Sequence, residues 1–175
     1  MVAATGSYDS LLAELAIPHR AKTAYRALLK AGPAAMPAMR RGLKHVSADV
    51  RYWCCQYLDR FLEPEVVGEL VTMLDDVDAR VRLTTLHTLA CDRCKVGDCR
   101  PEEAEILPRA IGLLTSDPDR HVRAMALEVV GRFVHGSDQA AAAIAAAGTG
   151  DSSPAVRKKA KWYAPGGAIY RRTAP

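Results

Sequence analysis

The sequence predicts an all-α solenoid, a fold in which helix pairs stack one against the next. Three observations lead to this prediction. A Val-Arg motif recurs four times, an apolar stripe of helical period follows it, and no stretch alternates apolar and polar residues as a strand would. The 175 residues fit one domain of ordinary size, and 49% apolar with 25% charged residues is typical of a globular protein.

Four helix starts share a Ser or Asp followed three residues later by Val-Arg. Ser and Asp are favourable N-caps because their side-chain oxygens accept hydrogen bonds from the first-turn amides. Pro154 follows the last cap, at a position where its missing N–H costs nothing. The valines are spaced by 31, 41 and 34 residues. The four copies are 47–51, 78–82, 119–123 and 153–157.

The helices that follow these starts share one apolar face. Positions four, five and eight after each valine are small or apolar in the first three copies. The fourth copy has Lys161 on this face, as a terminal repeat without a neighbour requires. The stripe residues are Cys54, Cys55 and Leu58, then Thr85, Leu86 and Leu89, then Ala126, Leu127 and Val130.

A second apolar helix is expected before each of these starts, and two more stretches form an opening pair. The first helices of the pairs are expected at 34–43, 64–74, 102–114 and 139–147, and the opening pair at 8–17 and 20–31.

Helix pairs of this period, with a D-x-x-V-R opening to the second helix, resemble HEAT repeats over residues 33–164. The resemblance is strongest to the short bacterial type found in phycobilisome-lyase-like proteins. It implies a right-handed α-solenoid of antiparallel helix pairs, in about four to five repeats, whose Asp and Arg residues bond along the turns. We expect a single HEAT-like domain over 1–164 and a flexible basic tail over 165–175.

The long interval between the second and third motifs contains a cysteine-rich insertion at 91–101. Cys91, Cys94 and Cys99 are spaced C-x2-C-x4-C, and His87 lies one helical turn before the first of them. Three thiolates and one imidazole suit a tetrahedral zinc ion, which would brace the insertion structurally because no coordination position stays open. An iron–sulfur cluster is less well specified by these ligands. The alternatives are cysteines that pack as small hydrophobes and a thiol switch.

Two further groups of residues are candidate binding sites. Arg51, Tyr52, Trp53 and Asp59 lie on one predicted helix and form a candidate patch for a protein partner, unless Trp53 fills the gap between repeats. Basic and aromatic residues near the C-terminus suit single-stranded nucleic acid, unless the last helix is simply charged on its exposed side. These residues are Arg157, Lys158, Lys159, Lys161 and Trp162.

The chain lacks the sequence motifs of hydrolases, kinases and dinucleotide-binding enzymes. We therefore expect a non-catalytic scaffold or adaptor that binds a protein partner. The alternative is a DNA-binding protein or a base-excision DNA glycosylase of HEAT-like fold, because that fold also includes such enzymes. We expect neither a membrane span nor a secretory signal, and the odd number of cysteines, five, leads us to expect a protein of the reducing cytoplasm.

Overall fold

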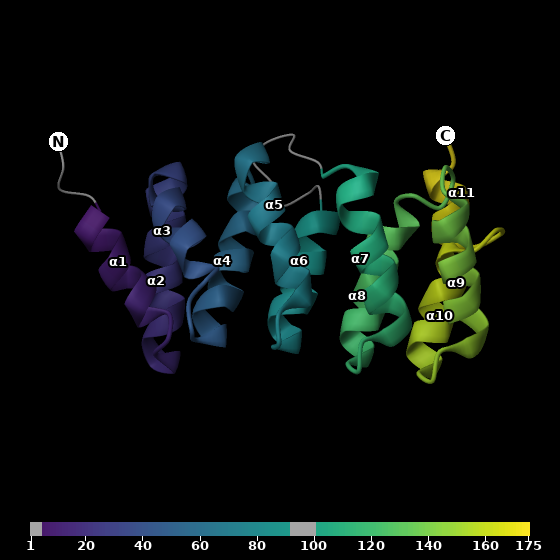
Figure 1. Ribbon diagram of the computed structural model, residues 1–175, viewed down its shortest axis with the longest axis horizontal. Coiled ribbons are helices and arrows are strands. Elements are labelled where there is room, and N and C mark those ends of the chain that lie inside the picture. Colours follow the sequence, from purple (N-terminus) through teal and green to yellow (C-terminus); the bar gives the residue numbers. More distant parts are fainter. Residues whose placement is uncertain (1–4, 92–100) are drawn as a thin grey trace. The chain divides into compact units, whose positions relative to one another are not determined.

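The structure is a computed structural model that describes residues 5–91 and 101–175 (Figure 1). Every regular element in these two ranges is a helix, which confirms the all-α fold class. The chain divides into two compact units, Met1–Arg100 and Pro101–Pro175. Whether both fold together as the one domain expected over 1–164 stays a prediction. Within the described residues, no helix is long and apolar enough to cross a membrane.

The first unit is built from helices that pack on their neighbours in chain order and across pairs. Helix α1 contacts α2 and α3, α4 contacts α2, α3 and α6, and the turn η2 contacts α5 and α6. The elements are α1 (Thr5–Glu14), α2 (Pro18–Ala31), η1 (Gly32–Ala35), α3 (Met36–Gly42), α4 (Ala48–Phe61), α5 (Pro64–Thr72), η2 (Met73–Asp75) and α6 (Ala79–Ala90).

The second unit repeats the same arrangement of helix pairs. Helix α8 contacts α7, α9 and α10, and α9 also contacts α7 and α10. The elements are α7 (Glu103–Ser116), α8 (Arg120–Gly131), α9 (Asp138–Gly150), α10 (Pro154–Tyr163) and α11 (Ala168–Thr173). The expected tail at 165–175 thus includes a short helix, and the His135 ring lies 4.3 Å from the Tyr170 ring of α11. The flexibility of this tail stays a prediction.

The four Val-Arg motifs begin the second helix of each pair, as expected. Ser47, Asp78, Asp119 and Ser153 are the N-cap residues of α4, α6, α8 and α10. The two aspartates act through their side chains, which accept hydrogen bonds from the amides of Arg80 at 2.8 Å and His121 at 2.6 Å. The two serine side chains make no capping bond in these helices.

The core follows the predicted apolar stripe. The valines of the four motifs are completely buried. Cys54 and Cys55 are also completely buried, and burial raises the pKa of both thiols, that of Cys55 to about 12. The two residues therefore act as small hydrophobes of the core, the use that the sequence favours for them.

The arginine of each Val-Arg pair ties its helix to the preceding turn. Each guanidinium donates through Nη1 to the carbonyl oxygens six and five residues upstream, and the shorter of the two distances is 2.6 to 2.8 Å in every copy. These carbonyl groups lie in a turn, where no helix provides a backbone N–H donor for them, so the arginine satisfies their hydrogen-bonding capacity. The arginines are Arg51, Arg82, Arg123 and Arg157.

Candidate functional site

An aromatic cluster joins α2 and α4 in the first unit. The Trp53 ring centroid lies 4.7 Å from that of Tyr25 and 5.2 Å from that of Tyr52, in tilted and edge-on orientations. Aromatic rings attract one another at such distances and angles. The Tyr25 hydroxyl also donates to the Gln56 carbonyl oxygen at 3.1 Å. The cluster therefore holds α2 against α4 while Tyr52 and Trp53 stay partly exposed.

A pocket of about 380 Å³ opens beside Tyr52 and Trp53. Two charged residues also line it, Asp49 of α4 and Arg80 of α6, which form an ion pair with 2.8 Å between Asp49 Oδ1 and Arg80 Nη1. About half of each side chain is exposed. Arg80 pairs with Asp78 as well, and hydrogen bonds to these two carboxylates raise the pKa of its guanidinium. We call this the aromatic pocket; its lining residues are Leu15, Pro18, Ala21, Asp49, Tyr52, Trp53 and Arg80.

The predicted protein-binding patch is divided by the fold. Tyr52 and Trp53 line the aromatic pocket, but Arg51 and Asp59 do not. Arg51 donates to both carboxylate oxygens of Asp76, at 2.6 and 2.9 Å, and this pair is largely buried.

Sequence reasoning missed Asp49 and Arg80 as pocket residues. Each stands directly before the valine of its motif, in successive copies. Residues at equivalent positions of neighbouring repeats lie side by side in a solenoid, so the alignment of the two copies could have revealed the pair.

Asp59 instead faces His87 and Cys91. A carboxylate oxygen of Asp59, a ring nitrogen of His87 and the Cys91 sulfur all lie within 4.8 Å of one another. Asp59 Oδ1 is 3.8 Å from His87 Nε2. Asp59 comes from α4, whereas His87 belongs to the last turn of α6 and Cys91 is the C-cap of that helix. The structure therefore brings together two of the four predicted metal ligands and adds a carboxylate.

Cys94 and Cys99, the other two predicted ligands, lie outside the described residues, as does most of the 91–101 insertion. Sequence reasoning missed Asp59 as a neighbour of His87 because the two residues are far apart in the chain. The packing of α4 on α6 brings them together.

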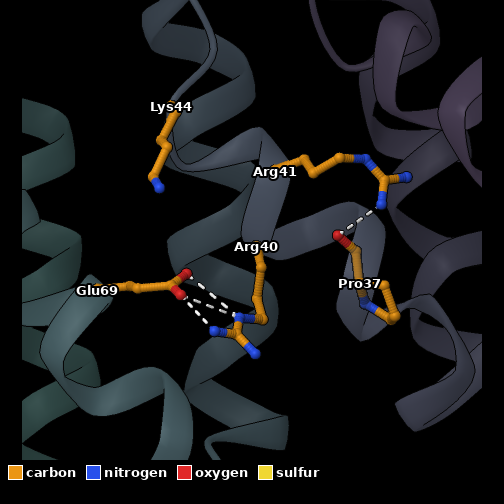
Figure 2. A pocket seen from close by; sticks show the side chains of 5 residues that line it. All are labelled: Pro37, Arg40, Arg41, Lys44 and Glu69. Atoms are coloured by element: carbon orange, nitrogen blue, oxygen red, sulfur yellow. Dashed lines mark hydrogen bonds and ion pairs between the residues drawn. The ribbon is translucent and has the colours of Figure 1, made fainter.

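A second pocket, of about 320 Å³, lies between α3 and α5 and has a mainly basic lining (Figure 2). Arg40 donates to both carboxylate oxygens of Glu69, and Arg41 donates to the Pro37 carbonyl oxygen at 3.1 Å. The bonds from Arg40 lower the pKa of Glu69, and the charge of Lys44 acts in the same direction. Sequence reasoning did not single out this pocket, although the R-R-x-x-K spacing of Arg40, Arg41 and Lys44 at the end of α3 was a visible signal.

The basic residues predicted to contact nucleic acid lie on α10, and two of them bond within the protein. Lys159 Nζ is 2.6 Å from Glu128 Oε1, and Arg157 donates to the carbonyl oxygens of Asp151 and Ser152. Lys158, Lys161 and Trp162 are exposed. The structure thus leaves three of the five predicted side chains facing solvent.

Comparison with known proteins places the chain in a fold class. No protein-family model matches it, and neither does any curated protein. One similar solved structure is a designed armadillo repeat protein in complex with the peptide (KR)4, with a TM-score of 0.58 and 18% sequence identity, over 89% of this chain and 79% of that one. At this identity the likeness shows the fold alone. The chain is therefore a helical repeat protein of the α-solenoid class.

Proposed function

We propose that this protein is a non-catalytic HEAT-like scaffold that binds a protein partner through the aromatic pocket. The observation that carries the proposal is the partly exposed pair Tyr52 and Trp53 beside an open pocket of about 380 Å³. Tryptophan and tyrosine are the residue types that most often dominate binding energy at protein interfaces. The similar designed repeat protein also holds a peptide, which agrees with this use of the fold.

The pocket chemistry suits an apolar side chain of an extended peptide. Leu15, Pro18 and Ala21 line the pocket together with the two aromatic rings, and of these three only Pro18 is exposed. The exposed ion pair of Asp49 and Arg80 lies at the edge, where its carboxylate and guanidinium can accept from and donate to a peptide backbone. An exposed ion pair contributes little to folding, so rearranging it on binding costs little.

A peptide selected from a display library against the full chain tests this proposal. We expect Trp53→Ala to weaken its binding by at least about 2 kcal/mol, the usual size of a hot-spot effect. Trp162→Ala, which removes a 44% exposed tryptophan from the other unit, is the matched control and should bind normally. If Trp53→Ala folds poorly, the peptide affinity of Arg80→Ala is measured in its place, and we expect it to be lower than that of the wild type. Equal affinities of the wild type and both pocket variants would reject the pocket.

The metal site expected from the sequence is part of this proposal. Zinc held by His87, Cys91, Cys94 and Cys99 would fix the insertion to the end of α6, because a polar loop of about ten residues buries too little apolar surface to order itself. Elemental analysis of protein purified without added metal is the test. A stoichiometry near zero for zinc and iron would exclude the site.

The alternative of a DNA-binding protein or DNA glycosylase has its own tests. Release of an alkylated base from duplex DNA, lost in Trp53→Ala or Asp59→Ala, would place the chain among the enzymes. Binding of single-stranded DNA that weakens steeply with salt and is abolished by removal of 157–175 would assign nucleic acid to the basic C-terminus. We expect no release of a base. We expect the chain to bind single-stranded DNA only weakly and non-specifically, at low salt.

A further inference from the structure

We propose that Asp59, His87 and Cys91 bind one zinc ion that joins α4 to α6. This inference rests on the proposed function for the presence of a metal, and it is an alternative to the ligand set given there. It differs in the ligands, since it adds a carboxylate from the neighbouring helix pair and needs only residues that the structure describes.

The geometry of the three side chains is close to that of a zinc site. Tetrahedral zinc with bonds of about 2.0–2.3 Å holds its ligand atoms about 3.3–3.8 Å apart. Asp59 Oδ1 and His87 Nε2 are already 3.8 Å apart, and the Cys91 sulfur lies within 4.8 Å of both groups. His87 and Cys91 are four residues apart at the end of α6, so their side chains leave the same face of the helix.

The burial of Asp59 is independent evidence that this group binds a cation. This residue is only 9% exposed, and its Oδ1 atom is buried without a hydrogen-bond partner among the described residues. An unpaired buried carboxylate oxygen is costly, and buried polar groups almost always have a partner. The His87 side chain is 39% exposed, so an ion can reach the site from solvent. A bound cation would supply the partner that Asp59 Oδ1 lacks.

The ligand types select zinc. Oxygen-only sites suit Mg²⁺ and Ca²⁺, whereas a set with an imidazole nitrogen and a thiolate sulfur suits zinc. One carboxylate, one thiolate and one neutral imidazole carry two negative charges, which a divalent cation balances. A site without net charge avoids the cost of burying an uncompensated ion. Three protein ligands leave the fourth tetrahedral position to an exchangeable ligand such as water.

Zinc titration of the metal-stripped full chain, in competition with a chelating dye, tests this site. We expect one ion per chain, and a loss of affinity above about 100-fold in Asp59→Asn, His87→Ala and Cys91→Ser, since loss of an outer-sphere partner alone costs about 10–100-fold. Asp138→Asn and His19→Ala, at exposed positions of α9 and α2, are matched controls with wild-type affinity expected. Circular dichroism of each metal-stripped variant checks that it is folded.

The decisive variant is Asp59→Asn, which keeps the shape of the side chain and removes its charge. If its zinc affinity equals that of the wild type, the proposal is wrong, and loss of binding in Cys94→Ser and Cys99→Ser would then favour the ligand set expected from sequence. A second reading uses Co²⁺, whose thiolate charge-transfer absorption should disappear in Cys91→Ser. Its persistence there would also overturn the site. Peptide binding in Asp59→Asn and zinc binding in Trp53→Ala should both be intact, so failure of either proposal is distinguishable from failure of the other.

Discussion

Arg123 of α8 and Asp151, in the turn before α10, form a bidentate ion pair. Nε and Nη2 of Arg123 donate to the two carboxylate oxygens of Asp151, at 2.8 and 3.0 Å. Asp151 Oδ1 also accepts from the Ser153 amide at 2.7 Å, just before α10 begins. Arg51 and Asp76 have the same relationship in the first unit, where Asp76 accepts from the Asp78 amide. The pair thus links the arginine of one repeat to the turn of the next.

Removing one partner of this pair should destabilise the protein strongly. The side chains of Arg123 and Asp151 are 11% and 5% exposed, so Arg123→Ala leaves a buried carboxylate without its partner. We expect a loss of about 3 kcal/mol in the free energy of unfolding, measured by urea denaturation. Arg41→Ala, which breaks a half-exposed pair with Asp9, should cost less than about 1 kcal/mol. Equal effects of the two variants would contradict this assignment.

The same pair predicts acid sensitivity. Hydrogen bonds from Arg123 hold the pKa of Asp151 below its ordinary value, and the pKa of Asp76 is also lowered, since bonds from Arg51 and the Asp78 amide outweigh burial. In the unfolded chain both pKa values return to about 3.9. The folded carboxylates therefore stabilise the protein above that value, and this contribution is lost as pH falls through the folded pKa.

We expect the free energy of unfolding to fall steeply below about pH 4 in the wild type, for this reason. Asp151→Asn removes one of the titrating groups and should show a shallower fall, measured by urea unfolding at several pH values. Asp138→Asn, at an exposed helix start, should keep the wild-type slope. A slope in Asp151→Asn as steep as that of the wild type would disprove the role of this pair.

Gly131 permits the close approach of α8 and α10. A Cβ atom at this position would collide with the ring of Tyr163. Because that ring is 8% exposed and has little room to move, we expect Gly131→Ala to destabilise the protein by about 1–3 kcal/mol. Gly112→Ala in α7 meets nothing within 4 Å and should stabilise by about 0.5–1 kcal/mol through helix propensity. Thermal unfolding of both variants measures the contrast.

The buried cysteines should be chemically inert in the folded protein. Cys54 and Cys55 are fully buried, and burial raises the pKa of both thiols, so almost no thiolate is present at neutral pH. We expect neither residue to be alkylated until denaturant unfolds the chain, as measured by peptide mass spectrometry. Cys91 is partly exposed and provides the comparison in metal-stripped protein, where no zinc protects its thiol. Labelling of Cys55 at the rate of Cys91 under native conditions would show that the core opens locally.

The helices, their starts and the face that each one buries could be predicted from the amino-acid sequence alone. These features depend on local spacing: Val81, Thr85 and Leu89 recur every four residues, and Asp78 and Asp119 cap their own helices. For this reason the expected and observed helix bounds agree within a few residues for most elements, as with 64–74 and α5 (Pro64–Thr72). Capping and periodicity act within one or two helical turns, so no knowledge of the packing was needed.

Contacts between side chains of different helices depend on how the helices pack. Arg51 stands beside Tyr52 in the chain, yet it bonds with Asp76 of the next turn, whereas Tyr52 lines a pocket with Arg80 of α6. Asp59 likewise faces His87 because α4 packs on α6. Such contacts cannot be predicted from the order of residues alone, because they depend on the crossing angle and relative position of the packed helices.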